Sequence, residues 1–570
     1  MKFLPHPPAL RWLAATVCLA TASLGAAEIP KEATPVLAAM RTELERSLNA
    51  FKSEPVAPYF LSYEVTEVHA YEVSASFGAL TGSSETRSRY LDLDLRVGEP
   101  SLDNTHAIRG AGSGDDGNSG AQALPVDDDP DAIRAALWYH TDRRFKTAVE
   151  QLTKVKANVK LRVAEEDKSD DFASAPPVVA VKAPVDVKFD RATWEARVKR
   201  YTQPFATHGD LFSARSSVTI EATTRWYVNS EGALLQDTQT TARLSISASA
   251  KADDGMVLPR HESYFAFTAD KLPDDAKIAA DVERMIKDLV ALRNAPIVDP
   301  YAGPAILSGR AAGVFFHEVF GHRIEGHRQK RAEEGQTFKK MLGQKLLPET
   351  FNVYCDPALE RFGTTDLGGY FRYDNQGVAG QRVPLIEAGV FKGFLMSRIP
   401  IEGFPVSNGH GRKSIGNSVV SRQSNLIVES TKTVTRAELK KELLKLVAEQ
   451  GKPYGLLFDD IEGGFAITGR TSPNAFNVQP IIVYRIHPDG REELVRGVDF
   501  IGTPLSAFSR IVAADNEPAV FNGVCGAESG WVPVSAISPG LLLSQVEIQK
   551  KAKSQEQLPI LPAPLGNPTE

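Results

Sequence analysis

The sequence predicts an α+β protein of two domains, in which helices pack against mostly antiparallel sheets and the C-terminal domain is rich in strands. Its 570 residues exceed one ordinary domain, because a domain usually spans roughly 100–200 residues. Alternating apolar segments joined by turn residues predict hairpins, and apolar residues at helical spacing recur between them. Hydrophobic residues make up 42% and charged residues 24%, which excludes disorder, collagen and coiled coil as the dominant class.

Charge and hydropathy exclude two classes of partner. Acidic residues outnumber basic ones, 71 to 65, and the net charge is −6. A protein that binds the phosphate backbone of nucleic acid would show a basic excess instead. Beyond the N-terminal segment, no stretch approaches the 18 or more apolar residues that suggest a membrane-spanning helix. We therefore expect neither a nucleic-acid partner nor an integral membrane span.

Residues 1–27 have the pattern of a secretory signal peptide. Lys2 and Arg11 precede the short apolar run 12–20, and the small residues of 22–27 follow. This order of a basic, an apolar and a small-residue region is typical of a cleaved signal. We predict cleavage near the end of 22–27 and export of the mature chain to the periplasm, with an uncleaved N-terminal anchor as the alternative.

The N-terminal domain is predicted over residues 28–295. Apolar residues at helical spacing, or in alternation with polar ones, predict its elements in chain order. These are a helix at 34–51, strands within 59–97, a helix at 131–155, strands within 211–270 that include a hairpin at 225–235, and a helix at 276–293. Segments near 98–130 and 164–190 are rich in Gly, Ser, Asp, Ala or Pro and are predicted to be insertions without regular structure.

The C-terminal domain is predicted over residues 296–550, followed by a tail at 551–570. The clearest elements are a hairpin at 383–395 that turns at 387–389, an amphipathic helix at 435–450, and a strand at 480–486 paired with 493–495. Many short strands and frequent glycines make this domain rich in β-structure.

The residues with the clearest chemical potential follow a helix-compatible run of Ala, Val and Phe. His317 and Glu318 are adjacent, and His322 follows five residues after His317. Zinc proteases commonly space two histidines four apart on one helical face, with the glutamate as base. The extra residue turns the imidazoles about 140° apart on an ideal helix. We therefore predict a π-bulge that absorbs this residue, eased by the neighbouring Gly321. The plainer alternative is a helix with surface histidines.

A catalytic zinc ion needs a third protein ligand and keeps one position open. Glu325 and His327 are the local candidates, and Cys525 is a distant candidate in a glycine-rich segment before a strand. The alternative for Cys525 is a small buried apolar residue.

The chain has only three cysteines, so a disulfide scaffold is excluded. Cys18 is expected to leave with the signal peptide, and Cys355 is expected to be a buried residue at a strand end. In an oxidising compartment, a disulfide between Cys355 and Cys525 is the alternative that any metal site must be weighed against.

These motifs resemble the TldD/PmbA family of metallopeptidases over roughly residues 296–550. The resemblance rests on the His317-Glu318-x-x-x-His322 motif and on Cys525-Gly526. Further matching segments are Asp374-Asn375-Gln376-Gly377, Asn408-Gly409-His410-Gly411-Arg412, Asp459-Asp460-Ile461-Glu462-Gly463-Gly464 and Val532-Pro533-Val534.

The resemblance implies a zinc-dependent peptidase of the catalytic, TldD-like type, because the family's companion subunits lack the His-Glu motif. It implies that His317, His322 and Cys525 bind Zn²⁺ and that Glu318 is the general base. It also implies small or unfolded polypeptides as substrates, and a homodimer or a heterodimer with a family paralogue. The predicted signal peptide and insertions depart from the best-known members. The alternative function is a non-catalytic peptide-binding or maturation scaffold of the same fold.

Overall fold

The computed structural model describes residues 30–108, 120–160, 167–330, 334–469 and 476–551. The predicted signal peptide and nearly all of the predicted tail lie outside these ranges. Within them, no helix is long and apolar enough to cross a membrane. Helices and mostly antiparallel sheets make up the fold, so the predicted fold class is confirmed.

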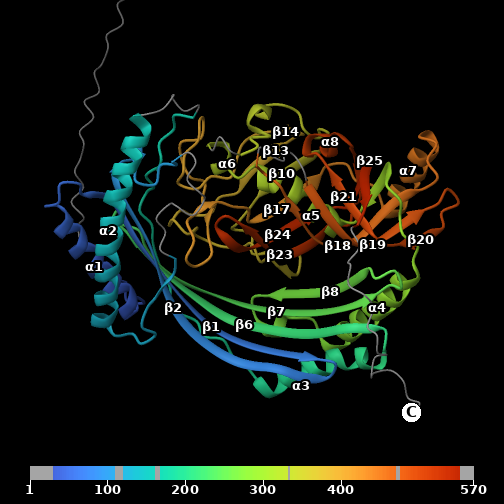
Figure 1. Ribbon diagram of the computed structural model, residues 1–570, viewed down its shortest axis with the longest axis horizontal. Coiled ribbons are helices and arrows are strands. Elements are labelled where there is room, and N and C mark those ends of the chain that lie inside the picture. The colour runs from blue at the N-terminus through green and yellow to red at the C-terminus, as the bar shows by residue number, and fades with distance from the viewer. Residues whose placement is uncertain (1–29, 109–119, 161–166, 331–333, 470–475, 552–570) are drawn as a thin grey trace, which may run out of the picture.

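A large curved sheet dominates the N-terminal half (Figure 1). Its strand order is β3-β2-β1-β6-β7-β5, with β4 paired to β2 and β8 paired to β7. The long strands are β1 (Pro58–Ser76), β2 (Ala79–Glu99), β6 (Leu211–Asn229), β7 (Leu234–Lys251) and β8 (Val257–Ala266). The short strands are β3 (Leu102–Asp103), β4 (Gln122–Ala123) and β5 (Val179–Val181).

Alternation of apolar and polar residues explains why these strands form one buried and one exposed face. In β6, Val218, Ile220 and Ala222 are buried while the residues between them are partly exposed. The hairpin predicted at 225–235 is confirmed, because β6 ends at Asn229 and pairs with β7 across a turn. The segment predicted as an insertion at 164–190 contains β5, which pairs with β7 in parallel and extends the sheet.

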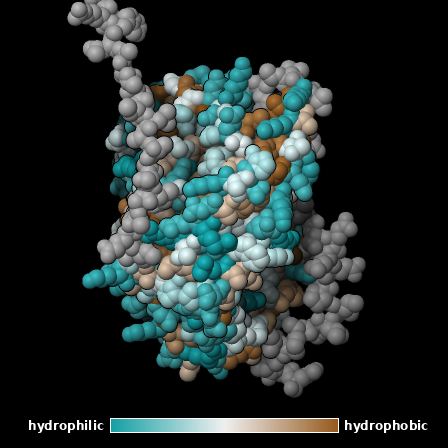
Figure 2. Space-filling view, turned by 90° about the vertical axis from the view of Figure 1, so that its left-hand side faces the viewer, coloured by the Kyte–Doolittle hydropathy of each residue, from teal (hydrophilic) through white to brown (hydrophobic). Residues whose placement is uncertain are grey.

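Four helices flank this sheet. They are α1 (Pro35–Phe51), α2 (Pro130–Lys160), α3 (Arg191–Thr202) and α4 (Asp275–Asn294). The helices predicted at 34–51 and 276–293 are confirmed within a residue or two, and the one predicted at 131–155 extends to Lys160. In α1 the buried residues recur at helical spacing and enter a shared core with β1 and β2. Figure 2 shows the face on which α1 and α2 lie, where hydrophilic side chains predominate.

The C-terminal half contains two larger sheets. One has the order β14-β13-β10-β17-β24-β23, and the other β18-β9-β25-β21-β19-β20 with β22 paired to β25. The first comprises β10 (Phe351–Cys355), β13 (Val383–Glu387), β14 (Val390–Phe391), β17 (Asn425–Ser430), β23 (Ala519–Ala527) and β24 (Gly530–Ser538). The second comprises β9 (Tyr301–Leu307), β18 (Gly455–Ala466), β19 (Phe476–Ile486), β20 (Glu492–Val495), β21 (Val498–Gly502), β22 (Ile511–Ala514) and β25 (Leu541–Lys550).

The remaining elements of this half are short pairs and helices. β11 (Arg361–Phe362) pairs with β12 (Thr365–Asp366), and β15 (Gly411–Arg412) pairs with β16 (Val420–Ser421). The helices are α5 (Gly309–Val319), α6 (His327–Lys330), α7 (Arg436–Glu449) and α8 (Pro504–Ser509).

Three local predictions for this half are confirmed. β13 and β14 form the predicted hairpin, with Ala388 and Gly389 in its turn at φ values of 46° and 77°. The predicted helix at 435–450 is α7, which begins with a capping box between Thr435 and Glu438. The predicted strand at 480–486 lies within β19 and pairs with β20.

Helix α5 positions the candidate site because it lies buried between the two C-terminal sheets. It contacts β18 on one side and β23 and β24 on the other. Two glycines allow this close approach: a Cβ at Gly309 would lie 2.6 Å from the carbonyl oxygen of Ser538, and a Cβ at Gly313 3.1 Å from that of Ala536. The tight packing holds the last turn of α5, which carries His317, against the edge of β23.

Candidate metal centre

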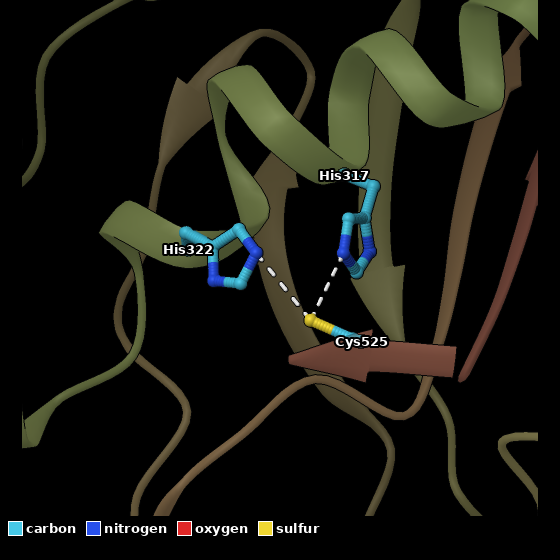
Figure 3. Close-up of side chains that lie close together, drawn as sticks. All are labelled: His317, His322 and Cys525. Carbon is cyan, nitrogen blue, oxygen red and sulfur yellow. Dashed lines mark hydrogen bonds between the residues drawn. The ribbon is translucent and has the colours of Figure 1, made fainter. Parts of the chain in front are cut away.

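Three side chains from separate elements converge at the C-terminal end of α5. His317 lies in the last turn of α5, His322 lies in a 3₁₀ turn at Gly321–Arg323, and Cys525 lies on β23 (Figure 3). Sγ of Cys525 is 3.2 Å from Nε2 of His317 and 3.4 Å from Nε2 of His322. The ligand atoms of all three residues lie within 4.8 Å of one another, and all three side chains are buried.

The predicted π-bulge is wrong. Helix α5 ends at Val319, Phe320 leaves the helix with φ −113° and ψ −52°, and a 3₁₀ turn follows. A helix end followed by a tight turn redirects the chain, and this brings His322 back beside His317. Gly321 was predicted to ease a π-bulge, but its role here is to leave room for Gln423. A Cβ at this position would lie only 1.9 Å from Oε1 of Gln423.

The three residues fit a tetrahedral zinc ion. Zn–S and Zn–N bonds of about 2.3 and 2.0 Å at tetrahedral angles place sulfur and nitrogen roughly 3.5 Å apart. The observed separations of 3.2 and 3.4 Å are close to this value. Two imidazoles and one thiolate leave the fourth position of such an ion for a water molecule or a substrate.

Electrostatics favour the thiolate form of Cys525, which is the form that binds metals. Burial alone would raise the pKa of this thiol, but the positive charges of His322 and then His317 lower its pKa well below the ordinary range. Burial likewise opposes the charged form of His322, whereas Cys525 and Glu325 raise the pKa of His322 well above its usual value. The buried site therefore prefers a negative sulfur beside positive charge, and a divalent cation would supply that charge.

Glu318 lies beside the three candidate ligands without joining them. Its Oε2 atom is buried, has no hydrogen-bond partner in the part of the chain that the structure describes, and lies 3.8 Å from Nε2 of His322. A buried carboxylate oxygen without a donor is costly unless something else occupies its surroundings. A water molecule or a substrate group beside the ligand cluster would satisfy this atom.

The two local candidates for the third ligand lie outside the cluster. Oε2 of Glu325 is 3.4 Å from Nδ1 of His322, on the side of the ring that faces away from Cys525. His327 instead forms a short hydrogen bond through Nε2 with Glu528. Among these candidates only Cys525 is brought to the two motif histidines.

Cys355 and Cys525 are both free, so the alternative disulfide is not formed. Cys355 ends β10 in the hydrophobic core, as expected for a structural cysteine. Burial raises the pKa of its thiol to about 12, which makes this thiol a poor nucleophile and a poor ligand.

Sequence reasoning missed two residues that contact the site. Nε2 of Gln423 lies 3.4 Å from the backbone oxygen of His317, and Nη2 of Arg422 donates a hydrogen bond to Sγ of Cys525 at 3.2 Å. Both lie on the segment between β16 and β17, about a hundred residues from either partner. No local motif marks them, because only the tertiary fold brings this segment to the site.

A cavity of about 410 Å³ opens beside the ligands. Its lining includes Gly463 and Gly464 of β18, Val524 of β23, Glu528, and Glu318 of α5. Trp531 also lines the cavity and is 68% exposed. The three ligand residues are thus buried, and they border a cavity large enough for a short peptide segment.

A mixed helix-and-sheet fold with a buried His-His-Cys cluster at a cavity defines a candidate metalloprotein. Residues 180–291 match the family model described as the PmbA/TldA metallopeptidase central domain, and residues 301–550 match that of the C-terminal domain. Together these segments cover more than half of the chain. The chain belongs to the PmbA/TldD family, as its motifs predicted.

Curated relatives carry names that agree with this family. A protein named metalloprotease from Archaeoglobus fulgidus is 29% identical over 245 residues, which cover 42% of this chain and 51% of that protein. A zinc metalloprotease TldD homolog from Saccharolobus solfataricus is 24% identical over 262 residues, which cover 44% of this chain and 52% of that protein. The chain thus spans about half the length of the curated relatives it matches.

Two solved structures share the fold. TldE from Thermococcus kodakarensis has a TM-score of 0.57 at 15% identity, with 90% of this chain and 100% of that chain covered. A putative modulator of a DNA gyrase from Thermotoga maritima has a TM-score of 0.58 at 14% identity, with 89% of this chain and 99% of that chain covered. At these identities the likeness concerns the fold alone.

Proposed function

We propose that this protein is a zinc-dependent peptidase that hydrolyses peptide bonds in small or unfolded polypeptides. The observation that carries the proposal is a carboxylate oxygen of Glu318 without a hydrogen-bond partner among the described residues, in a side chain that lines a cavity beside the buried cluster of His317, His322 and Cys525. A general base requires such an arrangement, with a free acceptor next to a site for the water molecule it must deprotonate. The relatives named metalloprotease also support this activity.

His317, His322 and Cys525 would hold the zinc ion, which would supply Lewis acidity for polarising the scissile carbonyl and for acidifying a water molecule. Glu318 accepts the proton of that water molecule at Oε2 and then donates it to the leaving amine. The Glu318 side chain is buried, so its carboxylate acts in a low-dielectric environment where its charge interacts strongly. His317 and His322 remain neutral in their role as ligands.

An extended peptide fits this cavity better than a folded protein. Among the described residues, β9 pairs only with residues 456–458 of β18, so the edge of β18 on that side has no strand partner there further along, near Gly463 and Gly464. β23 is the terminal strand of its sheet over the same described ranges, so one of its edges also lacks a strand partner within them. Unpaired strand edges bind extended backbone by adding a strand. We therefore propose that substrates enter as extended, unfolded segments.

Metal analysis of the purified protein, together with cleavage of a panel of small peptides, tests the proposed function. We expect about one zinc per chain, loss of cleavage after chelation, and its recovery on adding Zn²⁺. A protein that binds peptides but neither holds metal nor cleaves them would instead be the non-catalytic scaffold, and that result contradicts the proposal.

The contact between Gly464 and Glu318 gives a sharper prediction. A Cβ at Gly464 would lie 2.8 Å from Cγ of Glu318 and 2.8 Å from the backbone oxygen of Asn477, whereas a Cβ at Gly463 meets no atom within 4 Å. We expect Gly464→Ala to displace Glu318 and to lower kcat at least tenfold, because a misplaced base transfers protons poorly.

The matched control is Gly463→Ala, which adds the same methyl group one residue earlier. It leaves Glu318 in place because its methyl group meets no atom within 4 Å, so its loss of kcat should be several-fold smaller than that of Gly464→Ala. Zinc content, measured on both variants, should stay at the wild-type level. Equal kcat values for the two alanine variants would contradict the prediction that catalysis depends on the position of Glu318.

A further inference from the structure

A buried ion pair lies directly behind two of the three candidate ligands. It joins Oε1 of Glu325 to Nε of Arg422 over 3.3 Å, and both side chains have no exposed surface. Burying a carboxylate and a guanidinium costs several kcal/mol per ion unless each group finds further partners. The further partners of these two residues include the candidate metal ligands His322 and Cys525.

Arg422 surrounds Cys525 with hydrogen-bond donors. Its Nη2 donates to Sγ of Cys525 at 3.2 Å and to the backbone oxygen of the same residue at 2.8 Å. Its Nη1 donates to Oγ of Ser529 at 2.8 Å and to the backbone oxygen of Gly530 at 3.0 Å. The guanidinium is thereby fixed on both sides, with one N–H aimed at the sulfur atom.

Glu325 contacts the other candidate ligand, His322, through its carboxylate. Its Oε2 lies 3.4 Å from Nδ1 of His322 and accepts a hydrogen bond from Nε of Arg328 at 2.9 Å. A carboxylate only accepts, so Nδ1 of His322 carries the proton and its Nε2 lone pair faces Cys525. Glu325 therefore selects the tautomer of His322 that can bind a metal ion through Nε2.

We propose that Glu325 and Arg422 form a positioning pair that tunes the metal ion through its ligands. Glu325 raises the electron donation of His322, while the charged N–H of Arg422 withdraws electron density from the Cys525 thiolate. Hydrogen bonds to a metal-bound sulfur are a known means of adjusting the metal. Arg422 thus offsets the strong donation of a thiolate ligand and keeps the ion a better Lewis acid, while Glu325 holds His322 in the orientation that binds the ion. This proposal rests on the metal site of the proposed function.

Cobalt substitution tests the pair without relying on peptide cleavage. Co²⁺ bound to a thiolate has a sulfur-to-metal charge-transfer band whose energy reports the donor strength of the sulfur. We expect Arg422→Met to move this band to longer wavelength, because the sulfur electrons lose a stabilising hydrogen bond. Metal affinity, measured by competition with a chelator, should fall about 10–100-fold.

Arg422→Lys keeps the buried positive charge beside Glu325 but replaces the planar fork with a single amine. It should fold even if Arg422→Met does not, bind Co²⁺ less tightly than the wild type, and show a shifted band. The matched control is Arg398→Met, since Arg398 is also fully buried and pairs with Glu231, away from the sulfur. This control should leave the band in place.

Glu325→Gln separates the two halves of the pair. It should weaken metal binding through His322 while shifting the sulfur band less than Arg422→Met does. If the folded Arg422→Lys variant has wild-type affinity and an unshifted band, the positioning role is overturned although the metal site stands. If wild-type protein binds no Co²⁺ at all, the metal site itself is overturned.

Discussion

Replacing Glu318 with glutamine is expected to abolish peptide hydrolysis while zinc stays bound. Glutamine keeps the size of the side chain but cannot accept a proton from water near neutral pH. Loss of a general base typically lowers the rate about 10²–10⁴-fold. Because Glu318 lies outside the His-His-Cys cluster, the metal content should not change. Cleavage assays on a small-peptide panel and zinc analysis of the same preparation measure both effects.

Glu462→Gln is the matched control for this variant. Glu462 lines the same cavity and its side chain is exposed, so the substitution removes one carboxylate charge without touching the buried cluster. We expect kcat within about threefold of the wild type, in keeping with the small effects of exposed charges. Sustained cleavage by Glu318→Gln, or an equal loss in both variants, would show that Glu318 is not the base.

Cys525→Ala is expected to remove zinc and activity together. The thiolate is the only ligand supplied by β23, and two imidazoles alone hold zinc far more weakly than three protein ligands. Zinc per chain should fall from about one to near zero after dialysis against a weak chelator. The variant should keep its fold, because the core around α5 does not depend on this sulfur atom.

Cys355→Ala provides the comparison for the cysteine variant. Cys355 is buried in the hydrophobic core and makes no contact with the cluster, so its replacement should lower stability modestly and leave the zinc content intact. Thiol titration of unfolded wild-type protein should give both cysteines reduced. Zinc retained by Cys525→Ala, or lost equally by Cys355→Ala, would exclude Cys525 as a ligand.

Local patterns predicted most elements of the fold. The hairpin at 383–395 and helix α7 depend on turn residues and a capping box, which act over a few neighbouring residues. β5 was missed because its three residues pair with β7 only after long-range folding, and its Ala/Pro-rich surroundings have no alternation of their own. The predicted domain limits, signal peptide and dimer stay predictions.

The candidate site likewise has a part that the sequence predicted and a part that it did not. The His-Glu motif selected His317, Glu318 and His322, and it left Glu325, His327 and Cys525 as candidates for the third ligand. The family resemblance chose Cys525 among them and assigned the roles. Neither an ideal helix nor the predicted π-bulge describes the extra residue between the histidines. The chain ends the helix instead, since Gly321 packs against the distant Gln423.

The sequence by itself therefore determined the fold class, the family and the residues able to bind a metal ion. Residue types and short spacings encode these properties directly. Only the tertiary structure decided that Glu325 lies behind His322 rather than in the cluster, and that Arg422 contacts Cys525. The contact between Arg422 and Cys525 joins segments about a hundred residues apart, whose meeting depends on how α5 packs between two sheets. Glu325 is only three residues from His322, and its place depends on the 3₁₀ turn that follows α5 rather than on spacing alone.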